Sequence, residues 1–365
     1  IKCNTNNPVL LIDEVDKMVK DIKGDPASAL LDILDPNQNE MFVDNYIDEP
    51  FDLSKVFFIL TANNEQLIPE ALKDRLEIIR LSGYTEFQKL EIANNYLLPK
   101  LYKEHKITNE IKINNECLKI IINNYTKEAG VRELERLLNK IIRKIITASY
   151  VNLEDIKCNL KKDEIKTYLG QKLYEVNTSK KRFTSGVVHG LAYTSLGGRV
   201  MSIETTMYDG TGKIEITGML GNAMKESVKV ALGFIKANSN KFEINENYYS
   251  KKDIHIHFLE GAAPKDGPSA GIGIVTALIS LFKKDKISKD IAMTGEISLK
   301  GDIIKIGGLK EKLIGAYNGG IKKVIIPESN IADIEEIDER IKSKLEIITV
   351  NTYQEVYNLL FKDEE

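Results

Sequence analysis

Two different spacings of apolar residues distinguish the first part of the chain from the region that follows it. Near the N-terminal end, residues 8–12 and 55–60 are almost continuously apolar, and each run is followed by polar residues. This pattern is typical of buried strands. Farther along, apolar residues recur every three or four positions over 85–98, 114–124 and 131–148. That spacing predicts three amphipathic helices.

Both spacings occur after residue 185, which predicts an α+β domain in which strands and helices are mixed. We expect strands near 186–192, 200–206, 213–217, 253–258, 290–294 and 323–327, and helices over 220–236, 269–283, 308–317 and 353–361. The stretch Asp209-Gly210-Thr211-Gly212-Lys213 lacks the spacing of a phosphate-binding loop and precedes a strand. We therefore interpret it as a hairpin turn.

Two capping boxes support the predicted helix starts. In such a box, a Thr or Ser side chain and a Glu or Gln three residues later each bond the other's backbone N–H group. Thr85-Glu86-Phe87-Gln88 precedes the helix over 85–98, and Thr352-Tyr353-Gln354-Glu355 precedes the last one.

These changes of pattern predict a multidomain α/β chain. A typical domain has roughly 150 residues, so 365 residues correspond to two or three domains. We expect an α/β region over 1–82, an all-helical region over 83–172, a polar linker over 173–185 and an α+β domain over 186–365.

Charge and cysteine content narrow the functional classes. The net charge is −3 and the isoelectric point is near 6.0, so nothing global favours nucleic-acid binding. The basic run Lys180-Lys181-Arg182 is interpreted as solvated linker charge. The three cysteines show no CxxC spacing, which predicts neither a disulfide framework nor a zinc site and suits a reducing compartment.

No signal peptide or membrane span is expected from this sequence. The longest apolar run, 271–282, is too short and too rich in glycine to cross a bilayer. We expect an intracellular protein, in the bacterial cytoplasm rather than, as the alternative, the mitochondrial matrix. The chain starts within a motif, which indicates a piece of a longer protein.

One serine is placed as a nucleophile would be. Residues 264–271 read Pro-Lys-Asp-Gly-Pro-Ser-Ala-Gly, in which small and turn-forming residues leave the hydroxyl of Ser269 uncovered. An apolar helix is predicted to start directly after it. Unpaired amides and the positive end of a helix dipole gather at such a start and stabilise an oxyanion. An ordinary helix-capping serine is the alternative interpretation.

A lysine in the second motif, Gly-Gly-Leu-Lys-Glu-Lys-Leu at 307–313, is the candidate base. On a helix, Lys312 shares one face with the apolar Leu313 and Ala316, whereas Lys310 points roughly 160° away, towards solvent. Burial favours a neutral amine, so we select Lys312. The alternative is a lysine whose stem merely covers apolar surface.

Histidine is the more common partner of a catalytic serine. His255 and His257 alternate with apolar residues, which predicts one face of a strand. We interpret both as structural strand residues rather than as the base.

These motifs closely resemble those of the Lon family of ATP-dependent proteases, over essentially the whole chain. The segments 264–271 and 307–312 are similar to the serine and lysine motifs of that family, as is the interval of 43 residues between Ser269 and Lys312. The resemblance implies that Ser269 is the nucleophile and Lys312 the general base. It makes Thr294, in Met-Thr-Gly-Glu-Ile, a candidate to bond the lysine amine. Asp266 is a supporting residue, a turn residue or a helix cap.

The N-terminal part resembles an AAA+ ATPase from the Walker B motif onward. The resemblance implies that Asp13 orients Mg²⁺ and that Glu14 polarises the attacking water. Asn63 matches sensor 1, which would contact the γ-phosphate or the water, and Arg132 matches sensor 2. Arg75 matches the arginine finger that reaches a neighbouring subunit, and a surface salt bridge is the alternative interpretation. The helical region then matches the AAA+ lid.

The chain departs from the family in one respect. No GxxxxGK[ST] sequence occurs, so only half of a nucleotide site is present. We expect no stable ATP binding by this chain, and ATP and Mg²⁺ use only in a longer parent protein. The peptidase chemistry itself is expected to need no cofactor.

The sequence therefore predicts a serine endopeptidase that degrades damaged, misfolded or short-lived regulatory proteins, as part of a homohexamer. No membrane or nucleic-acid partner is expected. The alternatives are a non-catalytic Lon-like scaffold and an AAA+ remodelling protein whose C-terminal domain only binds partners.

Overall fold

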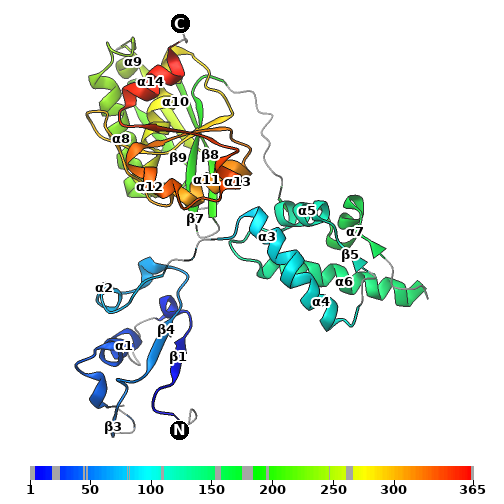
Figure 1. Ribbon diagram of the computed structural model, residues 1–365. Helices are drawn as coiled ribbons and strands as arrows, with labels where there is room; N and C mark the ends of the chain where they lie inside the picture. The colour runs from blue at the N-terminus through cyan, green and yellow to red at the C-terminus, as the bar shows by residue number, and fades with distance from the viewer. Residues whose placement is uncertain are drawn as a thin grey trace. The chain divides into compact units, whose positions relative to one another are not determined.

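The structure is a computed structural model and describes most of the chain (Figure 1). The described residues are 5–18, 25–43, 46, 48–79, 81, 83–107, 111–152, 158–174, 184–194, 197–245, 247–259 and 266–362. Most of the predicted linker, its basic run 180–182 and the first two residues of the serine motif lie outside them. The chain divides into two compact units, Ile1–Leu81 and Ser82–Glu365, and each is described by itself.

The first unit is built around two parallel strands. β1 (Val9–Ile12) pairs with β4 (Phe57–Leu60) in the register Val9↔Phe57, which brings the carboxyl ends of both strands to one edge. The described part of this unit also contains α1 (Pro26–Leu34), α2 (Glu70–Lys73), the short hairpin of β2 (Phe42–Val43) and β3 (Pro50–Phe51), and three 3₁₀ turns. Their small core consists of Val15, Leu30, Ile68 and Leu72.

The expectation that β1 and β4 are buried strands is wrong. Val9, Leu11 and Phe57 are each at least 60% exposed. In the described part of the chain these strands pair only with each other, and only Ile12 and Leu60 at their ends pack against the small core. An apolar run predicts a strand, but its burial depends on what packs over it.

The helical region of the second unit has a core of its own. Its helices are α3 (Glu86–Ile92), α4 (Leu98–Glu104), α5 (Asn115–Tyr125), α6 (Arg132–Asn152) and α7 (Ile165–Leu169). The capping box predicted at Thr85 is present, with both of its side chain–backbone bonds to Gln88. A π-helical turn, Ala93–Leu97, joins α3 to α4. Pro99 lacks an N–H group, and its ring would crowd a carbonyl one turn earlier, so a wider turn is expected there.

The prediction that this region is all-helical is wrong in one detail. β5 (Ile111–Lys112) and β6 (Cys158–Asn159) pair in parallel. Two-residue strands carry no periodic signal.

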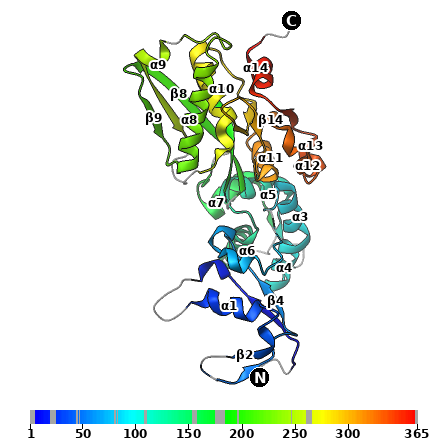
Figure 2. The same ribbon diagram turned by 90° about the vertical axis from the view of Figure 1, so that its left-hand side faces the viewer.

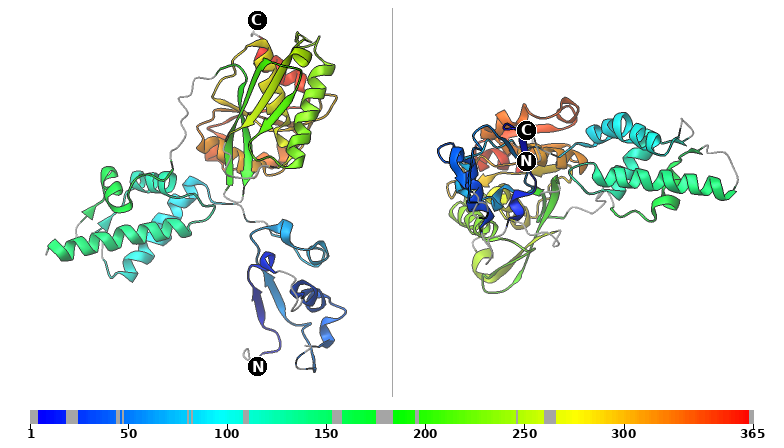
Figure 3. Two further views of the ribbon diagram at one scale, coloured as in Figure 1. Left: turned by 180° about the vertical axis from the view of Figure 1, so that it is seen from behind. Right: turned by 90° about the horizontal axis from the view of Figure 1, so that it is seen from below.

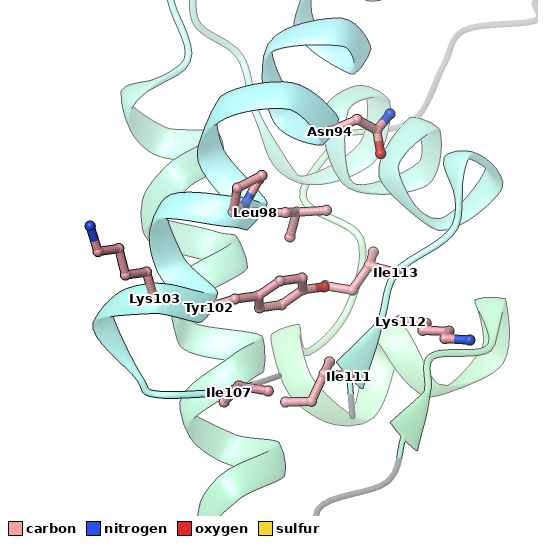
Figure 4. A pocket seen from close by; sticks show the side chains of 9 residues that line it. Asn94, Leu98, Tyr102, Lys103, Ile107, Ile111, Lys112 and Ile113 are labelled. Carbon is pink, nitrogen blue, oxygen red and sulfur yellow. The ribbon is translucent and has the colours of Figure 1, made fainter. Parts of the chain in front are cut away.

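A cavity of about 690 Å³ lies between α4 and β5, and Figure 4 shows the Tyr102 ring among its apolar side chains. Burial raises the pKa of this tyrosine.

The C-terminal domain is an α+β sandwich, as predicted, around a seven-stranded mixed sheet in the order β15-β14-β11-β7-β8-β10-β9. The strands are β7 (Val187–Thr194), β8 (Gly197–Asp209), β9 (Ile214–Thr217), β10 (Lys252–Phe258), β11 (Ile291–Met293), β14 (Lys323–Pro327) and β15 (Glu346–Val350). β8 is antiparallel to both β7 and β10, and the other pairs are parallel. The prediction of a hairpin turn at 209–213 is wrong: the segment connects β8 to β9, but β10 lies between these two strands in the sheet and pairs with both.

Helices cover both faces of this sheet (Figures 2 and 3). One face packs against α8 (Asn222–Ala237), α10 (Gly271–Lys283) and α14 (Tyr353–Phe361). The other packs against α11 (Leu309–Asn318) and α13 (Glu339–Lys342), with α12 (Ile331–Ile334) beside α11. α9 (Tyr248–Lys251) precedes β10. None of the helices in the described part of the chain is both long and apolar enough to cross a bilayer.

Some elements of this domain were not predicted. The hairpin of β12 (Glu296–Ile297) and β13 (Ile303–Ile304) is too short for a periodic signal, and β15 is a partly exposed edge strand. The second capping box is incomplete. Thr352 makes no side-chain cap; its hydroxyl instead donates to the Glu355 carboxylate, which also accepts from the backbone of Asn351.

Two glycines let α11 lie directly on the backbone of β8. A Cβ atom at Gly315 would lie 2.2 Å from the carbonyl carbon of Gly198, and one at Gly198 would lie 1.7 Å from the carbonyl oxygen of Glu311. Real Cβ atoms do not approach backbone so closely. This contact fixes the height of α11 above the sheet, and with it the height of Lys312.

We predict that Gly315→Ala lowers the free energy of unfolding by about 1–3 kcal/mol, because the added methyl group forces α11 away from β8. Urea unfolding of the two proteins measures this difference. Gly307→Ala is the matched control, since a Cβ there meets nothing within 4 Å. Equal stability of the Gly315 variant and the parent would contradict the prediction.

Candidate active site

Ser269 lies in a 3₁₀ turn, Pro268–Ala270, that leads into α10. Gly267, with φ of 128°, allows the chain to enter this turn. The backbone carbonyl of Ser269 accepts hydrogen bonds from Gly295 N (2.9 Å) and from the hydroxyl of Thr294 (3.2 Å). The serine is therefore held by its backbone at the start of a buried helix, near the positive end of the helix dipole. The expectation of unpaired amides there is wrong for the first two residues of α10, because Gly271 N donates to the carbonyl of Pro268 and Ile272 N to that of Gly295.

Lys312 belongs to the first turn of α11 and is only 4% exposed. Its helix neighbours Leu309, Leu313 and Ala316 are buried in one apolar cluster, the face that the sequence spacing indicated. Burial lowers the pKa of the Lys312 amine from 10.5 to about 8, against a smaller opposing effect of Glu311. Lys310, expected to face solvent, is half-buried. Of Lys310 and Lys312, Lys312 is therefore the better candidate for a base near neutral pH.

Thr294 connects the serine and the lysine. Its side chain is fully buried, and its hydroxyl accepts a hydrogen bond from Lys312 Nζ at 3.2 Å while donating to the carbonyl of Ser269 at 3.2 Å. A hydroxyl has a single hydrogen, so both bonds are formed only if the lysine is the donor. The threonine thus orients the Lys312 amine beside the backbone of Ser269.

Among the described residues, no hydrogen bond joins the Ser269 hydroxyl directly to Lys312. Proton transfer requires these two atoms at hydrogen-bond distance, and such distances are often longer before substrate binds. If Lys312 is the base for Ser269, the turn Pro268–Ala270 has to adjust, or substrate has to draw the two groups together.

Asp266 caps a neighbouring helix. Its carboxylate accepts from the backbone of Met224 (3.2 Å), in the first turn of α8, and from Gly267 N (3.0 Å). A Cβ at Gly221 would collide with this carboxylate, so the glycine makes room for it. Of the two interpretations that the sequence left open, the structure supports the helix cap.

The strand histidines bind a threonine. His255 Nε2 and His257 Nδ1 lie 2.9 and 2.6 Å from the hydroxyl of Thr217 on β9. Their neighbours Ile254 and Ile256 point into the core, so the histidines lie on the other face of β10. This arrangement agrees with a structural role.

The candidate nucleotide residues of the first unit gather where β1 and β4 end. The Thr61 hydroxyl donates to the carboxylate of Asp13, and Glu14 N donates back to the same hydroxyl at 3.1 Å. The side chain of Glu14 pairs with Lys17 at 2.6 Å, and Asn63 is exposed. Sequence reasoning did not select Thr61, although its position directly after β4 was the available signal.

The ligand atoms in this group are carboxylate and hydroxyl oxygens, which are the type that a magnesium–nucleotide complex requires. Mg²⁺ is usually held by one or two carboxylates together with substrate phosphates and water. No group of three or more His, Cys, Asp or Glu side chains suited to a metal ion occurs among the described residues. A phosphate-bound Mg²⁺ does not need one.

The two candidate arginines lie in different units. Arg75 pairs with Asp35 at 3.3 Å and donates to the carbonyl of Ala71, so it is held within its own unit. Hydrogen bonds from Asn37 and then from Arg75 lower the pKa of the Asp35 carboxyl. Arg132 is exposed at the start of α6, in the second unit.

Comparison with protein-family models finds three matches in succession along the chain. Residues 2–84 match the AAA family, ATPases associated with various cellular activities, and residues 103–155 match the Lon protease AAA+ ATPase lid domain. Residues 159–363 match the Lon protease (S16) C-terminal proteolytic domain. The predicted fold class is thereby confirmed: part of an AAA+ module, a helical lid and a Lon-type proteolytic domain.

The chain is also similar to curated proteins named Lon protease. It is 49% identical to that of Malacoplasma penetrans over 362 residues, which is 99% of this chain and 46% of that protein. For Mycoplasma mycoides the identity is 47%, over 99% of this chain and 46% of that protein. For Clostridioides difficile it is 48%, over 97% and 45%. The chain thus spans slightly less than half the length of these relatives.

The proteolytic-domain model alone covers more than half of the chain, and the curated relatives align with almost all of it. The serine, the buried lysine and the threonine between them lie inside the matched proteolytic region. The chain belongs to the Lon protease family.

Proposed function

We propose that this chain carries the peptidase centre of an ATP-dependent serine protease, with Ser269 as nucleophile and Lys312 as general base. The observation that carries the proposal is the buried lysine amine, whose pKa is lowered to about 8 and which bonds the same threonine hydroxyl as the Ser269 backbone. A lysine that served only as surface charge would not be buried in this way.

In the proposed reaction, Lys312 takes the hydroxyl proton of Ser269 as the serine oxygen bonds to the peptide carbonyl carbon. The carbonyl oxygen becomes an oxyanion, and the positive end of the α10 dipole stabilises it. The peptide C–N bond then breaks, and the protonated lysine returns its proton to the leaving amine. This step leaves an acyl-enzyme.

Water completes the cycle. Lys312, neutral again, takes a proton from a water molecule as the water oxygen attacks the acyl carbon. Breakage of the ester bond returns the proton to Ser269 and releases the carboxyl product. Thr294 orients the amine throughout, and its hydroxyl reacts with nothing.

In the whole protein, we propose that ATP-driven unfolding supplies this centre with damaged, misfolded or short-lived regulatory proteins. Hydrolysis of ATP bound with Mg²⁺ would supply the free energy for unfolding these substrates. Asp13 would hold the metal, Glu14 would polarise the attacking water, and Asn63 would contact the γ-phosphate or that water. Arg132 would contact phosphate from the lid.

The same proposal includes a homohexamer in the bacterial cytoplasm. Arg75 acts as a finger only if a neighbouring subunit presents a nucleotide, and it must then leave Asp35. An exposed or partly exposed ion pair of this kind is worth little, so its release is not a barrier. The relatives named above are bacterial, which supports the compartment.

We predict that Ser269→Ala and Lys312→Arg each lower kcat for a fluorogenic peptide by roughly 10⁴-fold or more, because the two residues act as one unit. Arginine keeps its proton and cannot serve as a base. Lys310→Arg is the matched control and should retain activity. Circular dichroism checks that the variants are folded. Substantial hydrolysis by Ser269→Ala would refute the assignment.

We predict that kcat/KM rises with pH and levels off above a midpoint near 8, because the base must be neutral and the pKa of the Lys312 amine is about 8. Initial rates at fixed ionic strength between pH 6 and 10 measure the profile. A midpoint near 6.5, the ordinary pKa of histidine, would point to an imidazole base instead.

We predict that Lys312→Met raises the free energy of unfolding at pH 7 by about 1–3 kcal/mol. The folded-state pKa of Lys312 lies below its unfolded value of 10.5. Between pH 8 and 10.5 the unfolded chain therefore binds more protons, and parental stability rises with pH across that window. The advantage of the variant should shrink over the same window. Urea unfolding at pH 7 and pH 10 tests both statements, and an advantage that does not change with pH would contradict the burial argument.

A further inference from the structure

The first residue of the last helix touches both elements that flank Ser269. Tyr353 begins α14 and is completely buried. Its side chain contacts α10, the helix that starts directly after the serine turn, and its backbone contacts the β12–β13 hairpin. The catalytic mechanism proposed above assigns Tyr353 no role.

The Tyr353 hydroxyl donates a hydrogen bond to α10. It lies 3.0 Å from the hydroxyl of Thr276, which in turn lies 2.8 Å from the carbonyl oxygen of Ile272. The single hydrogen of Thr276 is used on that carbonyl, so the tyrosine must supply the other. Ile272 belongs to the first turn of α10, so this chain of bonds ends three residues after Ser269.

The Tyr353 backbone holds the turn of the hairpin. Its N–H group donates to the carbonyl of Gly301 at 2.8 Å, and Ile303 N donates to Asn351 at 2.8 Å. Between these two bonds, Asp302 and Thr352 form an antiparallel bridge. The chain leading into α14 therefore extends the hairpin by a short third strand.

The hairpin in turn contacts the serine turn. Gly295, one residue before β12, donates to the carbonyl of Ser269 (2.9 Å) and accepts from Ile272 N (3.1 Å). A Cβ at Gly271 would lie 2.8 Å from the backbone nitrogen of Ile297, so α10 and β12 meet without side chains between them. Small shifts of either element would therefore move the nucleophile.

A purely apolar packing role does not explain the hydroxyl. The Tyr353 ring lies edge-on to Phe234 and Phe242, at 5.6 and 5.9 Å between centroids. A phenylalanine would make the same ring contacts without placing a hydroxyl in the core, where it is unfavourable unless bonded.

We propose that Tyr353 is a positioning residue for acyl transfer, which fixes the spacing between α10 and the β12–β13 hairpin and so places Ser269 relative to Thr294 and Lys312. This inference rests on the proposed role of Ser269 as nucleophile. It assigns the C-terminal helix a part in the reaction rather than in stability alone.

The test is Tyr353→Phe in the whole chain, assayed with a fluorogenic peptide and normalised to the serines that a fluorophosphonate labels at completion. We expect kcat per labelled serine to fall roughly three- to tenfold, which corresponds to the loss of one buried hydrogen bond. KM and the midpoint of the pH profile should stay as in the parent, because the substrate contacts and the burial of Lys312 are unchanged.

Tyr357→Phe is the matched control. Tyr357 lies one turn farther along α14 and its ring packs against the same Phe242, but its hydroxyl accepts a hydrogen bond from Lys283 at the far end of α10. It should keep the parental kcat, even if thermal stability drops. Thr276→Val should lower kcat as Tyr353→Phe does, and the double variant should fall no further.

Parental kcat per labelled serine in Tyr353→Phe would overturn the inference. An equal loss in Tyr357→Phe would also overturn it, since that result would indicate general loosening of the core. Ser269→Ala, measured in the same assay, distinguishes a failure of the proposed function from a failure of the positioning role. Activity remaining in that variant refutes the proposed function, whereas an inactive Ser269→Ala with a fully active Tyr353→Phe refutes only the positioning role.

Discussion

The chemistry proposed for the C-terminal domain depends on keeping one amine away from water. Lys312 is almost fully buried, and the hydrogen bond of its amine goes to a neutral hydroxyl rather than to a carboxylate. A carboxylate in that place would stabilise the charged form and raise the pKa of the lysine. The direct contact of α11 with the backbone of β8, through Gly198 and Gly315, secures this burial. Burial and the neutral partner together keep the amine able to accept a proton near neutral pH.

The serine is held in a different way. Its position is set by hydrogen bonds to its backbone carbonyl, which leaves the side chain able to turn. The proposed base is thus fixed by packing, whereas the proposed nucleophile lies in a short 3₁₀ turn whose backbone is bonded to Thr294 and Gly295. A fixed lysine and a serine whose side chain can turn suit the proposed reaction, in which the serine must approach the lysine and then carry an acyl group.

The sequence predicted those features that depend on local spacing. The shared face of Lys312, Leu313 and Ala316 follows from helix geometry, and the longer strands and helices of the C-terminal domain, apart from the edge strand β15, follow from its apolar pattern. Contacts between distant segments could not be read in the same way. The bond of Thr61 to Asp13 and the attachment of Tyr353 to Thr276 arise from packing. So does the exposure of β1 and β4, which an apolar pattern alone predicts to be buried.

The exposed strands of the first unit have a practical consequence. In the described part of the chain, β1 and β4 pair only with each other, so each keeps an open edge beside large apolar side chains. Open, apolar strand edges recruit further strands from other molecules, and two strands alone are marginally stable in water. Concentrated preparations of this chain should therefore tend to self-associate through the first unit. Covering that surface, with added chain or with charged residues on the strand edges, is the direct remedy.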